Sequence, residues 1–276
     1  PMPKDVVIVK ANGEKEVFNA LKLENSLLRV GASAETTEQI VKHITSELKD
    51  GMSTSQIYKH AFFLLHKAEH KVALRYSLKR AVMELGPSGF PFEDFVAEIF
   101  KAKGFTAETD KIVKGKCVEH EMDVVAYNEN KLIMCEAKFH NELGIKSDLK
   151  VALYIKARFE DLSSESFFFG KERKLDEGWL ITNTKFTSMA IDYGKCQKLK
   201  MIGWNYPEKG NLQDMIEDAG LHPLTCLTHL PQSYKNLLLK KGIVLCKTLV
   251  ENSLTMKAVG MKDDEIKNVI DEVSLL

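Results

Sequence analysis

The spacing of apolar residues changes along the 276-residue chain, and this change constrains the fold more than any other feature. Up to residue 86, apolar residues recur mainly at the intervals of amphipathic helices. From Phe92 to about Asp218, strand-like runs such as "EMDVVAY" and "GWLITNT" alternate with helical segments. From about Leu221 the pattern is helical again. Alternating strands and helices are typical of an α/β unit, so we predict an α/β multidomain protein.

Turn-forming residues mark the divisions between these parts. The stretch "GPSGFPFE", residues 86–93, contains two prolines and two glycines and is typical of a linker. Near the N-terminus, "DVVIVK" and "EKEVF" are joined by "ANG", which predicts a β-hairpin ahead of the helices. We therefore expect a mostly helical domain with a hairpin, an α/β core and a small helical domain, at residues 1–86, 87–218 and 219–276.

Composition excludes several classes of protein. The five cysteines are scattered and never form a CxxC pair, which argues against a disulfide framework and a cysteine zinc site. No apolar run approaches the roughly 18 residues that cross a bilayer. The opening "PMPKDVVIVK" lacks the apolar core of a secretory signal. We therefore expect a cytoplasmic protein with no membrane contact.

The net charge of the chain is zero, so any DNA-binding surface must be local. The lysines between residues 101 and 116 are one such local group.

The stretch "KLIMCEAKF" contains the most distinctive pattern in the chain. An apolar strand ends with Glu136 and Lys138, which point to the same side because side chains alternate along a strand. If "EMDVVAY" forms a hairpin with this strand, turning at Glu129-Asn130, then Asp123 lies opposite Glu136. Opposed residues have Cβ atoms about 4.5–5.5 Å apart. A slip of one residue would turn Asp123 to the other face, so the prediction depends on this register.

Two adjacent carboxylates repel each other unless a cation lies between them or one is protonated. Mg²⁺ binds carboxylate oxygens and activates water, and a nearby lysine stabilises charge that develops on a phosphate. The pattern thus fits phosphodiester hydrolysis. The other interpretation is a plain cross-strand salt bridge, because an acid two residues before a lysine occurs seven times in the chain. The instance at Glu136 is distinguished by its apolar strand and by the acid-bearing strand upstream.

Residues 87–218 resemble the Mrr-type branch of the PD-(D/E)xK nuclease superfamily. The resemblance is carried by "FPFEDFVAEIFKAKGF", "HEMDVVA", "CEAKFH" and "WLITNTKFTSMAIDYG", in that order. It implies a restriction-endonuclease-like core with a mixed sheet, in which Asp123 and Glu136 bind Mg²⁺ or Mn²⁺ and Lys138 assists the attacking water. Glu93 would be an auxiliary acid near the metal, or simply a carboxylate that stabilises a helix N-terminus. The proline of the motif's name is replaced by Met122.

Residues 5–86 resemble the ATP-cone, a regulatory nucleotide-binding domain. The matching segments are "VIVKANGEKEVFNALKLENSLLRVG", "DGMSTSQIYKHAF" and "ALRYSLKRAV". The resemblance implies that Val9, Lys10, Gly13 and Lys22 contact ATP or dATP. The family's arginine is replaced by alanine at position 11, and its two aspartates by asparagines at positions 12 and 19. The alternative is an ordinary helical domain with surface lysines.

The C-terminal part weakly resembles a pair of helix-hairpin-helix motifs, with Gly242 and Gly260 in the turns. Such turns offer backbone N–H groups to DNA phosphates, whereas the alternative is a helical cap. Taken together, the sequence predicts a nucleotide-regulated, metal-dependent DNA endonuclease. The rival interpretation is a catalytically inactive, nucleotide-responsive DNA-binding or regulatory protein. We expect a homo-oligomer, because cutting both strands needs two active sites.

Overall fold

The computed structural model describes residues 6–10, 13–86, 88–142 and 144–276. The chain forms two compact units, one comprising Pro1–Arg80 with Ser274–Leu276 and the other Ala81–Val273. Each is described by itself. The expected three-way division at residues 86 and 218 stays a prediction. The predicted fold class is confirmed, since the structure contains an N-terminal hairpin, helices, a mixed five-stranded sheet and a helical C-terminal segment.

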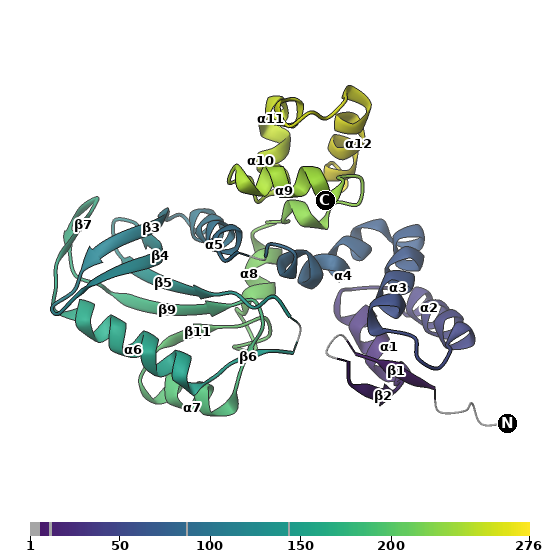
Figure 1. The fold of residues 1–276 in the computed structure, drawn as a ribbon, viewed down its shortest axis with the longest axis horizontal. Helices are drawn as coiled ribbons and strands as arrows, with labels where there is room; N and C mark the ends of the chain where they lie inside the picture. Colours follow the sequence, from purple (N-terminus) through teal and green to yellow (C-terminus); the bar gives the residue numbers. More distant parts are fainter. Residues whose placement is uncertain (1–5, 11–12, 87, 143) are drawn as a thin grey trace. The chain divides into compact units, whose positions relative to one another are not determined.

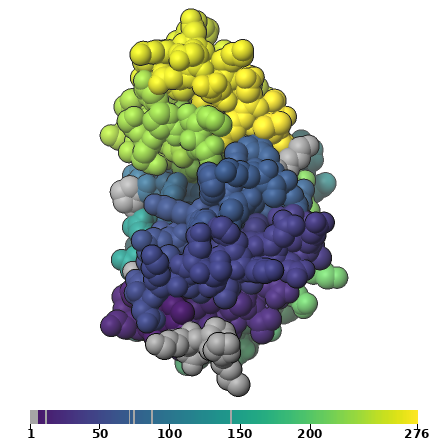
Figure 2. Space-filling model, turned by 90° about the vertical axis from the view of Figure 1, so that its right-hand side faces the viewer, coloured from purple at the N-terminus to yellow at the C-terminus, as the bar shows by residue number. Residues whose placement is uncertain are grey.

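The N-terminal unit begins with the predicted hairpin, in which Val7 pairs with Val17. The turn residues 11 and 12 lie outside the described residues. Its elements are β1 (Val7–Val9), β2 (Lys15–Val17), α1 (Ala20–Arg29), α2 (Ala34–Glu47), α3 (Thr54–Ala68) and the start of α4 (His70–Met83). The surface of this unit is drawn in purple to blue in Figure 2.

Helix starts in this unit follow from the sequence. Asn19, Ser33 and Ser53 each accept a backbone N–H with the side chain at the N-cap, and Ser53 forms a capping box with Gln56. The apolar faces of the helices meet in a core that includes Leu27, which is fully buried. Local capping and amphipathic spacing therefore account for the helices here.

The second unit is built on a mixed sheet with strand order β11-β9-β5-β4-β3. Strand β4 pairs antiparallel with both β3 and β5, whereas β5, β9 and β11 run parallel to one another. The strands are β3 (Thr106–Lys114), β4 (Glu119–Tyr127), β5 (Leu132–Lys138), β9 (Glu177–Thr182) and β11 (Lys200–Ile202). The smaller strands are β6 (Lys146–Ser147), β7 (Phe167–Phe169), β8 (Lys171–Arg173) and β10 (Lys185–Phe186).

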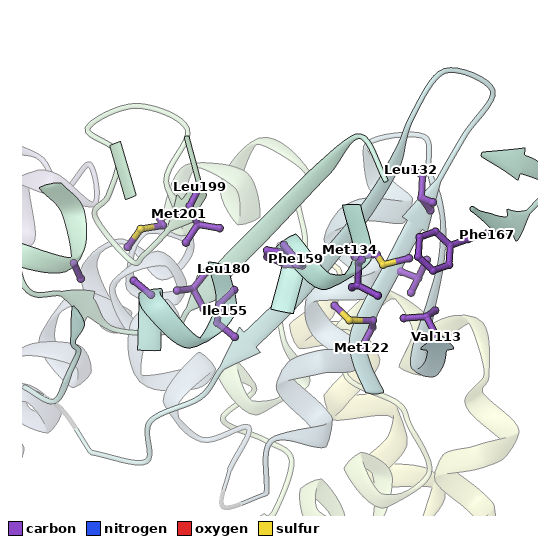
Figure 3. Close-up of a cluster of buried hydrophobic side chains, with 14 of the residues drawn as sticks. Val113, Met122, Leu132, Met134, Ile155, Phe159, Phe167, Leu180, Leu199 and Met201 are labelled. Carbon is purple, nitrogen blue, oxygen red and sulfur yellow. The ribbon is translucent and has the colours of Figure 1, made fainter. Parts of the chain in front are cut away.

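Helices cover the two faces of this sheet (Figure 1). Helix α5 (Phe90–Ala102) packs on one face, and α6 (Leu149–Ser163) and α7 (Ser188–Cys196) lie on the other. Figure 3 shows the apolar core that joins α6 to the sheet, with Phe159 among side chains such as Met134 and Leu180. Because this packing is continuous, the strand ends near α6 are held in fixed positions.

The remaining elements are helical. They are α8 (Leu212–Asp218), the short 3₁₀ helix η1 (Leu224–Cys226), α9 (Gln232–Lys240), α10 (Cys246–Glu251), α11 (Ser253–Ala258) and α12 (Asp263–Val273). Gly242 lies between α9 and α10 and Gly260 between α11 and α12, both with positive φ. The predicted helix–glycine–helix pattern is therefore present twice. No described helix combines the length and apolar character that a membrane span requires.

Candidate active site

The register of the β4–β5 hairpin is the one that the sequence predicts. Val124 pairs with Cys135 and Tyr127 with Leu132, so Asp123 stands opposite Glu136. The turn has no Asn-Gly pair, but the Asn128 side chain accepts N–H groups from Asn130 and Lys131, each at 2.9 Å. This local bonding fixes the turn in place of glycine. The step on which the prediction depended is confirmed.

The two carboxylates interact at the end of the hairpin. Asp123 Oδ2 accepts the backbone N–H of Ala137 at 2.7 Å, and Glu136 is 7% exposed. Burial first, and then the charge of Asp123, raise the pKa of Glu136 from 4.5 to about 8, against the opposing effect of Arg158. Burial also raises the pKa of Asp123, although the Ala137 N–H bond works in the other direction. In both cases the main cause is the removal of the carboxylate from solvent, and repulsion between charges adds to it.

Asp123 and Glu136 line a cavity of about 440 Å³, and two further predicted residues line it as well. Lys138 extends from the end of β5 and is exposed, and Glu93 comes from the first turn of α5. Burial, followed by the charges of Asp123 and Asp110, raises the pKa of Glu93 to about 8. The structure thus brings together all four residues predicted for catalysis. Helix α6 completes the cavity with Lys150, Val151, Tyr154 and Ile155.

Arg158 of α6 was not foreseen from the sequence. Its Nη1 donates to Glu136 Oε1 and to the backbone oxygen of Glu121, the latter at 3.1 Å. Its Nη2 donates to the Tyr154 hydroxyl at 2.6 Å. The guanidinium therefore partly neutralises the carboxylate that the sequence assigns to a metal. In the sequence, Arg158 is one of several charged residues on an amphipathic helix, and no local pattern distinguishes it.

Asp110 of β3 is a second residue that the sequence did not reveal. Thr109 pairs with Val124 and Lys111 with Met122, so Asp110 lies opposite Asp123. It has a φ of 54°, a left-handed conformation that aspartate tolerates better than most residues. Its charge raises the pKa of both Glu93 and Asp123. Strand β3 is polar along most of its length, so its hydrophobic pattern gave no signal.

These residues fit a hard divalent cation. Oxygen donors from Asp123 and Glu136 are the ligands that Mg²⁺ and Mn²⁺ take in proteins. Burial and then the charge of Asp123 raise the pKa of Glu136, and a cation between the two carboxylates would oppose both effects. Because the single guanidinium of Arg158 offsets only part of this charge, the donor set and its electrostatics both favour a metal.

The residues predicted to bind nucleotide lie in and beside the N-terminal hairpin. Lys10 Nζ lies 3.3 Å from carboxylate oxygens of both Glu14 and Glu16, and Lys22 Nζ lies 3.1 Å from Glu16. Lys10 and Lys22 thus converge on one acid. Gly13 has a φ of 83°, and Val9 donates its backbone N–H to Met52. Such exposed ion pairs contribute little stability, so phosphate groups can compete for these lysines.

Comparisons with known proteins identify relatives without a known activity. An uncharacterised protein of Archaeoglobus fulgidus is 34% identical over 178 residues, which is 64% of this chain and 97% of that protein. A crystal structure described as a protein of unknown function, AF1548, matches with a TM-score of 0.56 and 33% identity. The match covers 68% of this chain and 97% of that one. Protein VC1899 from Vibrio cholerae matches with a TM-score of 0.29 and 13% identity, over 82% of this chain and 53% of that one, and supports no argument.

A family model also matches the C-terminal part of the chain. The model "AF1548-like, C-terminal" matches residues 222–276. No ATP-cone or restriction-endonuclease family model matches the chain. Identity of 34% over nearly the whole length of the archaeal relative is sufficient to show common descent. The chain belongs to the AF1548-like family.

Proposed function

We propose that this protein is a Mg²⁺- or Mn²⁺-dependent endonuclease that hydrolyses phosphodiester bonds in DNA. The observation that carries the proposal is the opposed pair of Asp123 and Glu136, with Lys138 lining the same cavity. The simpler alternative is a plain cross-strand salt bridge, but the ion-pair partner of Glu136 is Arg158 of helix α6. The lysine is therefore left for another role.

Each side chain has a distinct task in this proposal. Asp123 and Glu136 would hold the divalent ion, which when bound supplies positive charge to the phosphate and lowers the pKa of water. Lys138 donates hydrogen bonds to the phosphate or to the attacking water and so stabilises negative charge as it develops. In the metal-free protein Glu93 carries a proton at neutral pH, because its pKa is about 8, and enters the site as a donor. Lys150, at the start of α6, offers a further contact for a phosphate.

Cleavage of supercoiled plasmid DNA tests this proposal directly. The wild type should nick or linearise the plasmid with Mg²⁺ or Mn²⁺ and be inactive with chelator. Asp123→Asn and Glu136→Gln should abolish cleavage, because each removes one charge from the metal site while keeping its shape. The matched control is Glu172→Gln, since Glu172 and Lys174 repeat the acid-x-lysine pattern on the exposed β7–β8 hairpin. Equal cleavage by all variants would refute the assignment.

One observation favours a second function. Because Arg158 already pairs with Glu136, the same geometry suits a protein that binds DNA but has lost cleavage. Such a protein would bind DNA with an affinity that falls steeply as salt rises, and would cut it under no metal condition. Filter binding at several salt concentrations, run beside the plasmid assay, separates the two functions.

We also propose that ATP or dATP binds the N-terminal unit and regulates the DNA activity. The support is the convergence of Lys10 and Lys22 beside the hairpin, together with the resemblance described above. Substituting alanine for both lysines should weaken nucleotide binding in a calorimetric titration, while the double control Lys240→Ala with Lys241→Ala should not.

Because cleavage of both DNA strands needs two active sites, we expect the active species to be a homo-oligomer. Sedimentation with and without nucleotide will test this expectation.

A further inference from the structure

A cluster of metal-ligating side chains lies far along the chain from the carboxylates of the nuclease-like site. His43 and Glu47 are four residues apart on α2, and His60 is on α3. Each offers one ligand atom, and these atoms all lie within 4.8 Å of one another. The cluster belongs to the N-terminal unit, whose proposed role in nucleotide binding uses other residues.

The ligand atoms are close enough that small rotations of the side chains would bring them onto one ion. His43 Nε2 lies 3.4 Å from Glu47 Oε1, and His60 Nδ1 lies 3.5 Å from Glu47 Oε2. In a tetrahedral zinc site with bonds of about 2.0–2.1 Å, neighbouring ligand atoms are about 3.3–3.4 Å apart. The two imidazoles approach edge to face at 5.1 Å between centroids. Because all three side chains are partly exposed, rotation of the rings can bring the nitrogens onto one ion without moving the helices.

Electrostatics favour a cation at this place. Glu47 is the last residue of α2, and the last turn of this helix contains no basic residue. A carboxylate there adds to the negative end of the helix dipole instead of balancing it. A neutral imidazole offers Glu47 a hydrogen bond but no opposing charge. A divalent ion would neutralise the carboxylate and use the lone pairs of both imidazoles at once.

We propose that His43, Glu47 and His60 form a Zn²⁺ site that joins α2 to α3. Two imidazoles and one carboxylate select a borderline transition metal over Mg²⁺ or Ca²⁺, which require oxygen donors. Three protein ligands on an exposed surface leave the fourth position to solvent. The chain therefore carries two metal sites of opposite preference, a hard one at Asp123 and Glu136 and an imidazole site on the N-terminal helices. This proposal does not depend on nuclease activity.

Zinc content of the full-length protein provides the test. After dialysis against limiting Zn²⁺ with excess Mg²⁺, which occupies the carboxylate site, the wild type should retain one Zn²⁺ per chain. His43→Asn and His60→Asn should each weaken Zn²⁺ binding by at least about tenfold, as expected when a metal ligand is lost. The matched control is His229→Asn. His229 also forms an ion pair with a glutamate, Glu272, but it does not belong to the cluster of His43, Glu47 and His60. Asp123→Asn should also leave the zinc content unchanged.

Cobalt substitution gives a readout that depends on no variant. Wild-type protein titrated with Co²⁺ should develop the intense visible absorption of a four- or five-coordinate ion, and Zn²⁺ should displace it. Absence of these bands would overturn the proposal. So would zinc retention that is the same in the wild type, His43→Asn and His60→Asn.

Discussion

Replacing Glu136 by glutamine should change how the stability of the sheet-containing unit depends on pH. The pKa of Glu136 is about 8 in the folded protein and near 4.5 when exposed. Below pH 4.5 both states are protonated and the group has no effect on stability. Between these values the folded state keeps a proton that the unfolded state releases, so the free energy of unfolding falls as pH rises. The loss is complete above pH 8.

The size of this effect follows from the shift. Each unit of pKa difference is worth about 1.4 kcal/mol, so a shift of roughly 3.5 units corresponds to about 5 kcal/mol as an upper value. Glutamine has the shape of protonated glutamate and does not titrate. At pH 5 the free energies of unfolding of the wild type and Glu136→Gln should therefore be similar. At pH 9, without metal, the variant should be more stable by about 3–5 kcal/mol.

Tryptophan fluorescence during urea unfolding is the appropriate assay. The chain has two tryptophans, Trp179 and Trp204, which are 8% and 4% exposed and both belong to the unit that contains Glu136. Adding Mg²⁺ at pH 9 should stabilise the wild type and leave Glu136→Gln unaffected, because only the wild type keeps both carboxylates. If the two proteins lose stability in parallel from pH 5 to pH 9, the reasoning about burial and repulsion at Glu136 is wrong.

Three further changes test other parts of the argument. Lys138→Ala should slow plasmid cleavage by about 100-fold or more, with Mg²⁺-induced stabilisation preserved, because in the proposed function the lysine acts on the phosphate and not on the metal; an unchanged rate would exclude that role. Arg158→Ala should lower the metal-free free energy of unfolding at pH 9 by about 3 kcal/mol and tighten Mg²⁺ binding, since it removes the counter-ion that competes with the metal. Calorimetric titration with Mg²⁺ measures the second effect, and weaker binding would contradict it. Ser53→Ala should destabilise the N-terminal unit by about 1 kcal/mol in far-UV circular dichroism melts, through loss of the capping box at α3, whereas no change would show that the cap contributes nothing.

The position of the acidic pair could be predicted because it depends on local rules. Side chains alternate along a strand, and a short turn fixes the pairing of the strands that it joins. Once the turn was placed at Glu129-Asn130, Asp123 had to face Glu136. The turn itself is held by Asn128, whose side chain bonds the next backbone N–H groups. Such a bond is a property of the sequence, although the pattern of apolar residues does not show it.

Residues contributed by distant elements could not be predicted in this way. Arg158 is 22 residues from Glu136 in sequence, and the contact exists because Phe159 and its neighbours fix α6 against the sheet. Asp110 is on β3, which lies at the edge of the sheet and is polar along most of its length. Edge strands commonly carry charged residues, so an acid there has no special meaning until the pairing of β3 with β4 is known.

Arg158 and Asp110 both affect the balance of charge in the site. Asp123 and Asp110 both raise the pKa of Glu93, and Asp123 also raises that of Glu136, yet Arg158 is the cation bonded to the buried Glu136. Stability alone gives no reason for this arrangement, because well-packed apolar residues of similar size are usually as stable as a buried ion pair. The surplus of carboxylates over buried cations is instead what a divalent ion would balance. In the metal-bound form that we propose, the divalent ion would compete with the guanidinium of Arg158 for the carboxylate of Glu136.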